Sequence, residues 1–138
     1  MKNSLLAFLL IFCTSVFAQN AQKENIKYVK ITQKICLKKI GYQLVLKEVI
    51  SDSRCPDGVI CVWAGEASAV ISVYKDSKLV EDKTIVFSPK NEEANQQLFA
   101  EYLPKKQRKI KTASVFPYPK QGITITKKDY YIKIGYIK

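Results

Sequence analysis

The chain has 138 residues, with 23 lysines and arginines against 12 aspartates and glutamates, a formal net charge of +11 and no histidine. The lack of histidine excludes the Ser-His and Cys-His nucleophile pairs and removes the commonest zinc ligand. The charge excess predicts attraction to anionic surfaces but says nothing about the fold.

Residues 1–18 have the pattern of a cleaved secretory signal peptide. Lys2 gives a positive start, an apolar run follows, and Ala18 fits the small-residue cleavage position. The run is too short to span a bilayer, which needs ~20 apolar residues. We therefore expect an exported protein, periplasmic or secreted, with a single β-rich domain over residues 19–138. Loss of Lys2 lowers the net charge to +10, and the remaining length suffices for one core.

The cysteines fit export as well, because an oxidising compartment lets a disulfide persist. Cys13 would leave with the signal peptide. Cys55 and Cys61 are predicted to pair, because the intervening Pro-Asp-Gly sequence can reverse the chain. Closing this loop would contribute about 2.4 kcal/mol in the chain-entropy model. Cys36 is left over, either as a reactive or intermolecular thiol or, the favoured interpretation, as an unpaired surface cysteine without a role.

Alternation of apolar and polar residues predicts most of the secondary structure as strands. The expected strands are 26–39 (one strand or two short ones), 42–50, 59–64, 67–74, 79–87, 112–116 and 129–137. Residues 76–78 are expected to form a hairpin loop, and residues 96–103 are compatible with either a helix or a strand. About eight short strands with little helix predict an all-β fold, a small antiparallel sandwich or barrel with one disulfide.

A basic run precedes the strand expected at 112–116. Its basic residues are Lys105, Lys106, Arg108, Lys109 and Lys111. Such a block can bind a polyanion or touch a membrane surface. The favoured interpretation is a solvated connection or a guarded edge strand, since lysine on an edge discourages pairing between sheets.

Residues 52–66 hold two of the four cysteines and the only tryptophan, and they are the candidate binding site. Asp52 and Ser53 can bond nearby backbone amides, Arg54 offers a rigid five-donor fork, and Trp63 is a large flat surface. Arginine and tryptophan dominate binding hot spots, so these side chains can form a recognition patch. The favoured alternative is structural: Arg54 and Asp52 satisfy each other, and Trp63 fills the core against the disulfide.

Three motifs resemble those of a family of small exported bacterial domains with no established activity. They are Asp-Ser-Arg-Cys-Pro at 52–56, Cys-x-Trp-Ala-Gly at 61–65, and Val-x-Pro-x-Pro at 115–119 ahead of Tyr130. The resemblance implies a compact β-rich exported domain with one disulfide. Cys36 is no part of the motif.

We expect a non-enzymatic exported domain that binds an envelope protein or an anionic glycan through the disulfide-bounded loop. The alternative is an inhibitor of an exogenous hydrolase that uses the Cys55–Cys61 loop as a rigid, pre-organised element. We expect no cofactor and no metal site, because three cysteines without histidine make no tetrahedral zinc set. Nucleic acid is not an expected partner, because most of the eight tyrosines lie within apolar alternation. For an enzyme, the only candidate nucleophile is Cys36, which no histidine could activate.

Overall fold

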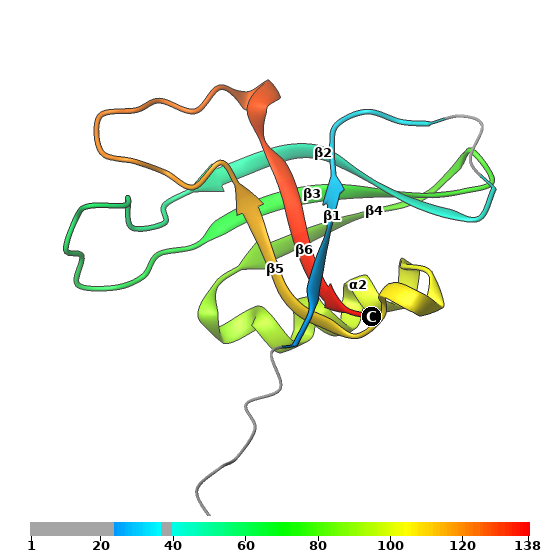
Figure 1. Cartoon of the computed structure of the whole chain (residues 1–138). Coiled ribbons are helices and arrows are strands. Elements are labelled where there is room, and N and C mark those ends of the chain that lie inside the picture. The colour runs from blue at the N-terminus through cyan, green and yellow to red at the C-terminus, as the bar shows by residue number, and fades with distance from the viewer. Residues whose placement is uncertain (1–23, 37–39) are drawn as a thin grey trace, which may run out of the picture.

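The computed structural model describes residues 24–36 and 40–138 (Figure 1). The predicted signal peptide, residues 1–18, lies outside the described residues. The strands are β1 (Ile26–Ile31), β2 (Tyr42–Asp52), β3 (Ala67–Lys75), β4 (Lys78–Phe87), β5 (Ile110–Phe116) and β6 (Tyr131–Ile137). The helices are η2 (Pro89–Asn91), α2 (Glu92–Tyr102), η3 (Lys105–Gln107) and η4 (Lys127–Asp129), of which only α2 is an α-helix.

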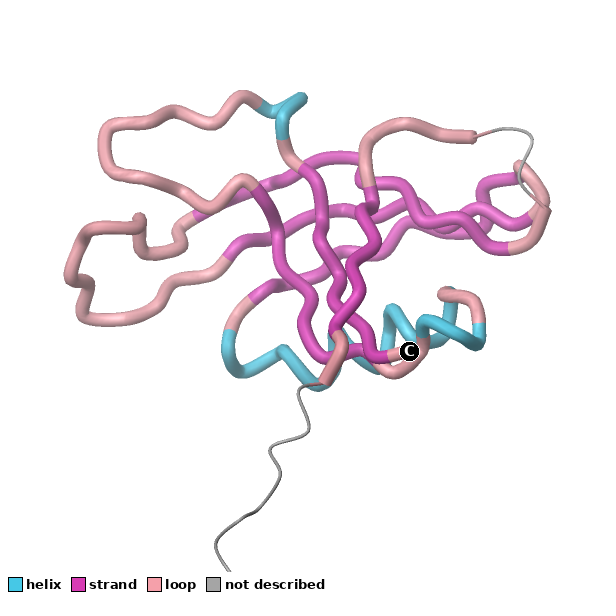
Figure 2. Tube along the Cα trace, viewed as in Figure 1, coloured by secondary structure: helices cyan, strands magenta, loops and turns pink. Residues whose placement is uncertain are grey.

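The strands form two three-stranded antiparallel sheets, which we call sheet A (β1-β6-β5) and sheet B (β2-β3-β4). Sheet A crosses in front of sheet B in Figure 1, and α2 lies below both sheets. Figure 2 shows two long loops side by side at one end, the β2–β3 loop and the β5–β6 loop. The fold therefore presents two sheets with a pair of neighbouring loops at one end.

One hydrophobic core draws on both sheets and on α2. Its most deeply buried large side chains are Phe99, Leu46, Ile71, Ile132, Ile134, Val73 and Val115. Apolar residues at every second position of β3 face this core, as the alternation predicts for a half-buried strand. The ring of Phe99 stacks on that of Phe87, with centroids 6.3 Å apart, and so joins α2 to sheet B.

For residues 96–103 the sequence allowed either a helix or a strand. Residues 96–102 belong to α2, and Leu103 is its C-cap. Glu92 and Glu93 lie in its first turn, where negative charge favours a helix, and Pro104 follows its end. Asn95, Phe99 and Tyr102 are buried, at the three- and four-residue spacing of one helix face. The hairpin loop is confirmed: Asp76 and Ser77 have φ of 49° and 67°, as a tight two-residue turn requires.

The predictions of a mostly β fold and one disulfide are confirmed, but the predicted number of strands is wrong. Six strands occur in the described part of the chain, instead of about eight. Residues 59–64 are a loop, because Ile60 and Val62 have no sheet to pack on and are fully exposed. The first expected strand ends at Ile31, and residues 37–39 within it lie outside the described part.

We expect Phe99→Ala to lower the free energy of unfolding by about 3–5 kcal/mol, because the ring is fully buried and its loss leaves a cavity. Glu101→Ala, an exposed position on the same helix, should stay within about 0.5 kcal/mol of the wild type. Urea denaturation measures both. A loss for Phe99→Ala no larger than that of the control would show that α2 is not part of the core.

Candidate functional site

Residues 53–66 connect β2 to β3 and contain most of the candidate site; we call this segment the disulfide loop. Its base is closed by two backbone hydrogen bonds, from Ser53 N to Glu66 O (2.8 Å) and from Cys55 N to Ala64 O (2.9 Å). Gly65 has φ +72°, and a Cβ atom there would lie 2.0 Å from Ser53 O. Only glycine permits this close approach of the two loop arms.

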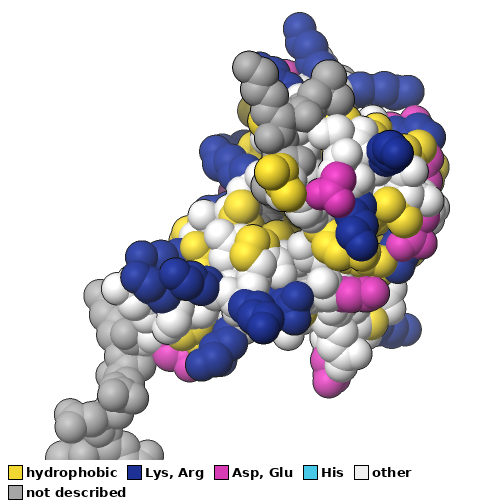
Figure 3. Space-filling view, turned by 90° about the vertical axis from the view of Figure 1, so that its right-hand side faces the viewer, with side chains coloured by type: hydrophobic (Ala, Val, Ile, Leu, Met, Phe, Trp, Pro, Cys, Tyr) yellow, Lys and Arg dark blue, Asp and Glu magenta, His cyan; other side chains and the backbone are white. Residues whose placement is uncertain are grey.

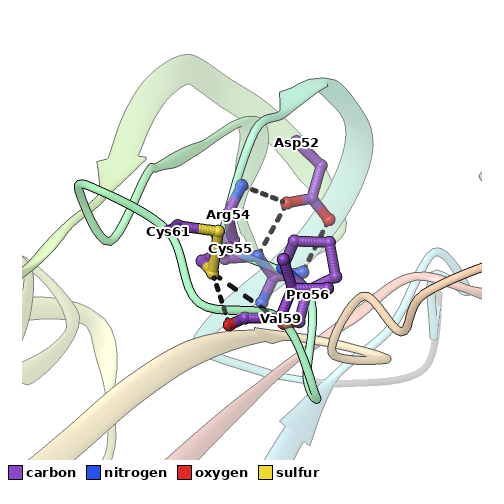
Figure 4. Close-up of a disulfide and its surroundings, with 6 residues drawn as sticks. All are labelled: Asp52, Arg54, Cys55, Pro56, Val59 and Cys61. Carbon is purple, nitrogen blue, oxygen red and sulfur yellow. Dashed lines mark hydrogen bonds and ion pairs between the residues drawn. A yellow bond between two sulfur atoms is a disulfide. The ribbon is translucent and has the colours of Figure 1, made fainter.

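The disulfide between Cys55 and Cys61 is confirmed, with the two Cα atoms 6.0 Å apart (Figure 4). Val59 N donates to Pro56 O at 3.2 Å, so the chain reverses at the turn that the sequence predicts. Cys55 Sγ also lies 3.3 Å from Val59 O. A disulfide sulfur carries no hydrogen, so this is a packing contact that holds the turn against the bridge.

Asp52 and Arg54 form a bidentate ion pair beside the disulfide (Figure 4). Arg54 Nε donates to Asp52 Oδ1 at 2.7 Å, and Arg54 Nη2 donates to Asp52 Oδ2 at 2.6 Å. Both side chains are more than nine-tenths buried. Two parallel bonds between a guanidinium and a carboxylate are strong and directional, so the pair fixes the entry to the disulfide loop.

The same guanidinium reaches the other sheet. Arg54 Nη1 donates to Val115 O, and Arg54 Nη2 donates to Pro117 O at 3.1 Å. The guanidinium also lies over the ring of Tyr118, 4.9 Å from its centroid. Arg54 therefore ties the end of β2, in sheet B, to the end of β5, in sheet A.

A tyrosine completes this network. Tyr130 Oη donates to Asp52 Oδ2 at 3.1 Å. Burial alone would raise the pKa of Asp52, but the hydrogen bonds and the charge of Arg54 outweigh it and hold that pKa below its ordinary value. Burial, followed by the adjacent Asp52 carboxylate, raises the pKa of Tyr130. The aspartate therefore stays charged and the tyrosine stays a hydrogen-bond donor.

The other predicted side chains lie outside this buried network. Trp63 is 65% exposed, so the expectation that it fills the core against the disulfide is wrong. Val59, Ile60 and Val62 are exposed beside it, and we call these four residues the apolar tip. Ser53 serves the loop base, where its hydroxyl donates to Glu66 O at 3.0 Å.

The β5–β6 loop, residues 117–130, adjoins the disulfide loop. Asp57 N donates to Pro119 O at 2.9 Å. The backbones of Asp57 and Lys120 form an isolated parallel β-bridge. Tyr118 and Ile123 of this loop are also exposed. The two loops thus hold each other at one end of the molecule and widen the apolar surface there.

A pocket of about 250 Å³ lies between the disulfide loop, α2 and β5. Its polar lining includes Arg54, Glu92, Asn95 and Tyr118. Sequence analysis missed the contributions of Glu92 and Asn95, since neither stands in a motif and only the folded chain brings α2 beside the loop. The position of Tyr130 was signalled only through the family resemblance.

The remaining candidates lie away from the disulfide loop. Cys36 is an exposed free thiol. The basic run is mostly exposed and follows α2 at the opposite end of the view in Figure 1. Within it, Arg108 Nε donates to Leu103 O at 3.1 Å, and Lys111 pairs with Glu24 at 3.1 Å. The structure does not bring Cys36 or the basic run together with Arg54 and Trp63.

Within residues 24–36 and 40–138, no group of three or more histidine, cysteine, aspartate or glutamate side chains could hold a metal ion. None of the helices in this part of the chain is long and apolar enough to cross a membrane. No family model, curated protein or solved structure matches the chain. The family resemblance of its motifs therefore stays a prediction.

We expect Asp52→Asn to lower the free energy of unfolding by about 3–5 kcal/mol at neutral pH, because it leaves the Arg54 charge buried without a partner. The folded-state pKa of Asp52 is lowered, so its contribution to stability is present above 3.8, the ordinary value, and is lost as the pH falls through the lowered pKa. The difference in free energy of unfolding between the wild type and Asp52→Asn should therefore become smaller on acidification below pH 3.8.

Denaturant titrations across pH measure this gap. Asp57→Asn, which changes an exposed carboxylate of the same loop, is the matched control and should keep the pH profile of the wild type. A gap that stays constant down to the lowest pH would show that the charge of Asp52 does not stabilise the fold.

Proposed function

We propose that this protein is an exported, non-enzymatic binding domain that captures a protein of the cell envelope or periplasm through its apolar tip. One observation carries the proposal: Ile60 and Val62 are fully exposed and Trp63 is 65% exposed, all on one short loop. Contiguous exposed apolar residues on a soluble domain mark interaction sites. Tryptophan is also the residue type most enriched at binding hot spots.

The construction of the loop supports the same function. The disulfide, the hydrogen bonds at the loop base and the Arg54–Asp52 pair all fix the apolar tip before any partner arrives. A pre-organised surface loses little conformational entropy on binding. In this proposal the two sheets pack as the small sandwich expected from the sequence. This sandwich is the rigid support that carries the disulfide loop at one end. Arg54 is a positioning residue within it, because its guanidinium is engaged inside the chain.

Export is supported by two independent features. The pattern of residues 1–18 is that of a signal peptide. The Cys55–Cys61 disulfide persists in an oxidising compartment, which the periplasm and the cell exterior provide.

Inhibition of an exogenous hydrolase is the second candidate function. The disulfide loop projects from one end of the molecule (Figure 1), and it is closed by a covalent bridge. A rigid projecting loop can enter an enzyme cleft with little loss of freedom. An inhibitor should slow at least one member of a panel of secreted proteases and glycosidases through this loop, and lack of effect across the panel would reject this function.

We expect Ile60→Ser with Trp63→Ser to weaken partner capture at least tenfold, since each exposed anchor contributes about 1–2 kcal/mol to binding. Stability should stay within about 0.5 kcal/mol of the wild type, because both side chains face solvent. The purified protein is immobilised and exposed to envelope extract of the producing cells. Captured proteins are then identified and quantified by mass spectrometry.

Leu79→Ser with Val80→Ser is the matched control, because both side chains are 55% exposed but lie on β4. This variant should retain capture. Equal capture by the wild type and the tip variant would contradict the proposal. Equal loss in the two double variants would also contradict it, since it would trace capture to general surface hydrophobicity.

A further inference from the structure

The outward face of sheet A carries lysines and aromatic rings. Ile31, Ile132 and Ile134 point into the core, so the alternate residues of β1 and β6 point away from it. Five side chains of this face define what we call the lysine–aromatic face: Tyr28, Lys30, Phe116, Tyr131 and Lys133. Ile26 lies beside Tyr28 at its edge. None of the functions considered above uses it.

Two positive charges lie directly opposite each other on this face. Lys30 of β1 pairs in register with Lys133 of β6. Like charges in this position destabilise a sheet. Within the part of the chain that the structure describes, neither lysine forms an ion pair with a carboxylate. The fold therefore tolerates a repulsion that a single acidic residue would relieve.

Aromatic rings hold both ammonium groups. Lys30 Nζ lies 4.7 Å from the ring centroid of Tyr131. Lys133 Nζ lies 4.2 Å from that of Tyr28 and 5.3 Å from that of Phe116. A ring attracts a cation without neutralising it, unlike a carboxylate. Both ammonium groups are thus positioned, and their charge stays available to an anion.

The side chains of this face are closely packed. A Cβ atom at Gly135 would lie 2.6 Å from Thr112 Oγ1 and 3.1 Å from the Tyr28 ring, so these side chains close over the glycine. The rings of Phe116 and Tyr131 stack with centroids 5.8 Å apart and planes at 19°. Lys30 and Lys133 lie opposite each other in register, so one extended ligand can reach both.

The surroundings add positive potential. The left-hand side of Figure 3 is the side that faces the viewer in Figure 1, where sheet A lies. This side is seen edge-on in Figure 3, where dark-blue lysine and arginine side chains lie in the left half of the view and most magenta acidic side chains lie in the right half. An anionic chain would therefore meet little repulsion there.

We propose that the lysine–aromatic face binds an acidic polysaccharide through its repeated carboxylate or sulfate groups. Lys30 and Lys133, which pair with no carboxylate among the described residues, match such anions in charge. Their ammonium groups cover the ring faces, which disfavours the base stacking that single-stranded nucleic acid needs. Ile26 is exposed to 37% at the edge of this face, but peripheral proteins enter a bilayer with a broader apolar face than one isoleucine provides. Tyr28, 56% exposed, offers a hydroxyl to sugar oxygens.

The test measures binding of the purified protein to immobilised polygalacturonate (carboxylate) and dextran sulfate (sulfate), with neutral dextran as a blank. We expect binding to at least one acidic polymer, weakening with salt, and the tighter one identifies the acid group. Lys30→Gln with Lys133→Gln should weaken binding roughly tenfold, from two lost charge contacts. Tyr28→Leu should weaken it about threefold at unchanged net charge, since Lys133 loses its ring.

Lys105→Gln with Lys106→Gln removes the same charge from the basic run and is the matched control, expected to weaken binding by less than about twofold. Equal weakening by the two lysine pairs would overturn the proposal, as would no binding to either acidic polymer. Tighter binding to a single-stranded oligonucleotide or to anionic phospholipid vesicles would also overturn it. The apolar-tip variant should bind the polymer as the wild type does, so this proposal and the proposed function fail separately.

Discussion

The bidentate pair between Asp52 and Arg54 is the constraint on which the rest of the structure depends. It lies at the end of β2, and its guanidinium also donates to two backbone carbonyls, that of Val115 within β5 and that of Pro117 directly after β5. One side chain thus joins sheet A, sheet B and the base of the disulfide loop. Removing one partner of such a pair costs more than the pair contributes, because a charge remains buried.

This arrangement separates the residues of the sequence motif into two groups. The side chains of Asp52 and Arg54 are buried. Gly65 permits the close approach of the two loop arms. These three residues therefore set the path of the chain at the loop base. Trp63 faces outward with its apolar neighbours. The buried residues fix the conformation of the exposed ones, so little conformational entropy is lost on binding. The lysine–aromatic face lies on the outer side of sheet A and uses none of these residues.

Much of the fold could be predicted because alternation reports local burial. The strands expected at 42–50, 67–74, 79–87 and 112–116 lie within β2 to β5, and the disulfide followed from the turn between its cysteines. The strand expected at 59–64 is wrong, because its apolar residues are exposed and have no packing partner. Asp52 was named as a partner of Arg54 from the sequence, but the two other acceptors of Arg54 are backbone carbonyls 61 and 63 residues away, which no side-chain pattern can reveal. The lysine–aromatic face likewise depends on the register of three strands.

Amide hydrogen exchange of Arg54→Lys tests most directly whether this guanidinium holds the loop, because lysine keeps the charge but not the fork. We expect the amides of Ser53, Cys55 and Asp57 to exchange roughly tenfold faster than in the wild type, as local opening becomes easier by about 1.4 kcal/mol. The amides of the core strand β3 should exchange as before. Unchanged exchange at the three loop amides would contradict the role of Arg54, and equal acceleration throughout would show that it acts on the whole fold.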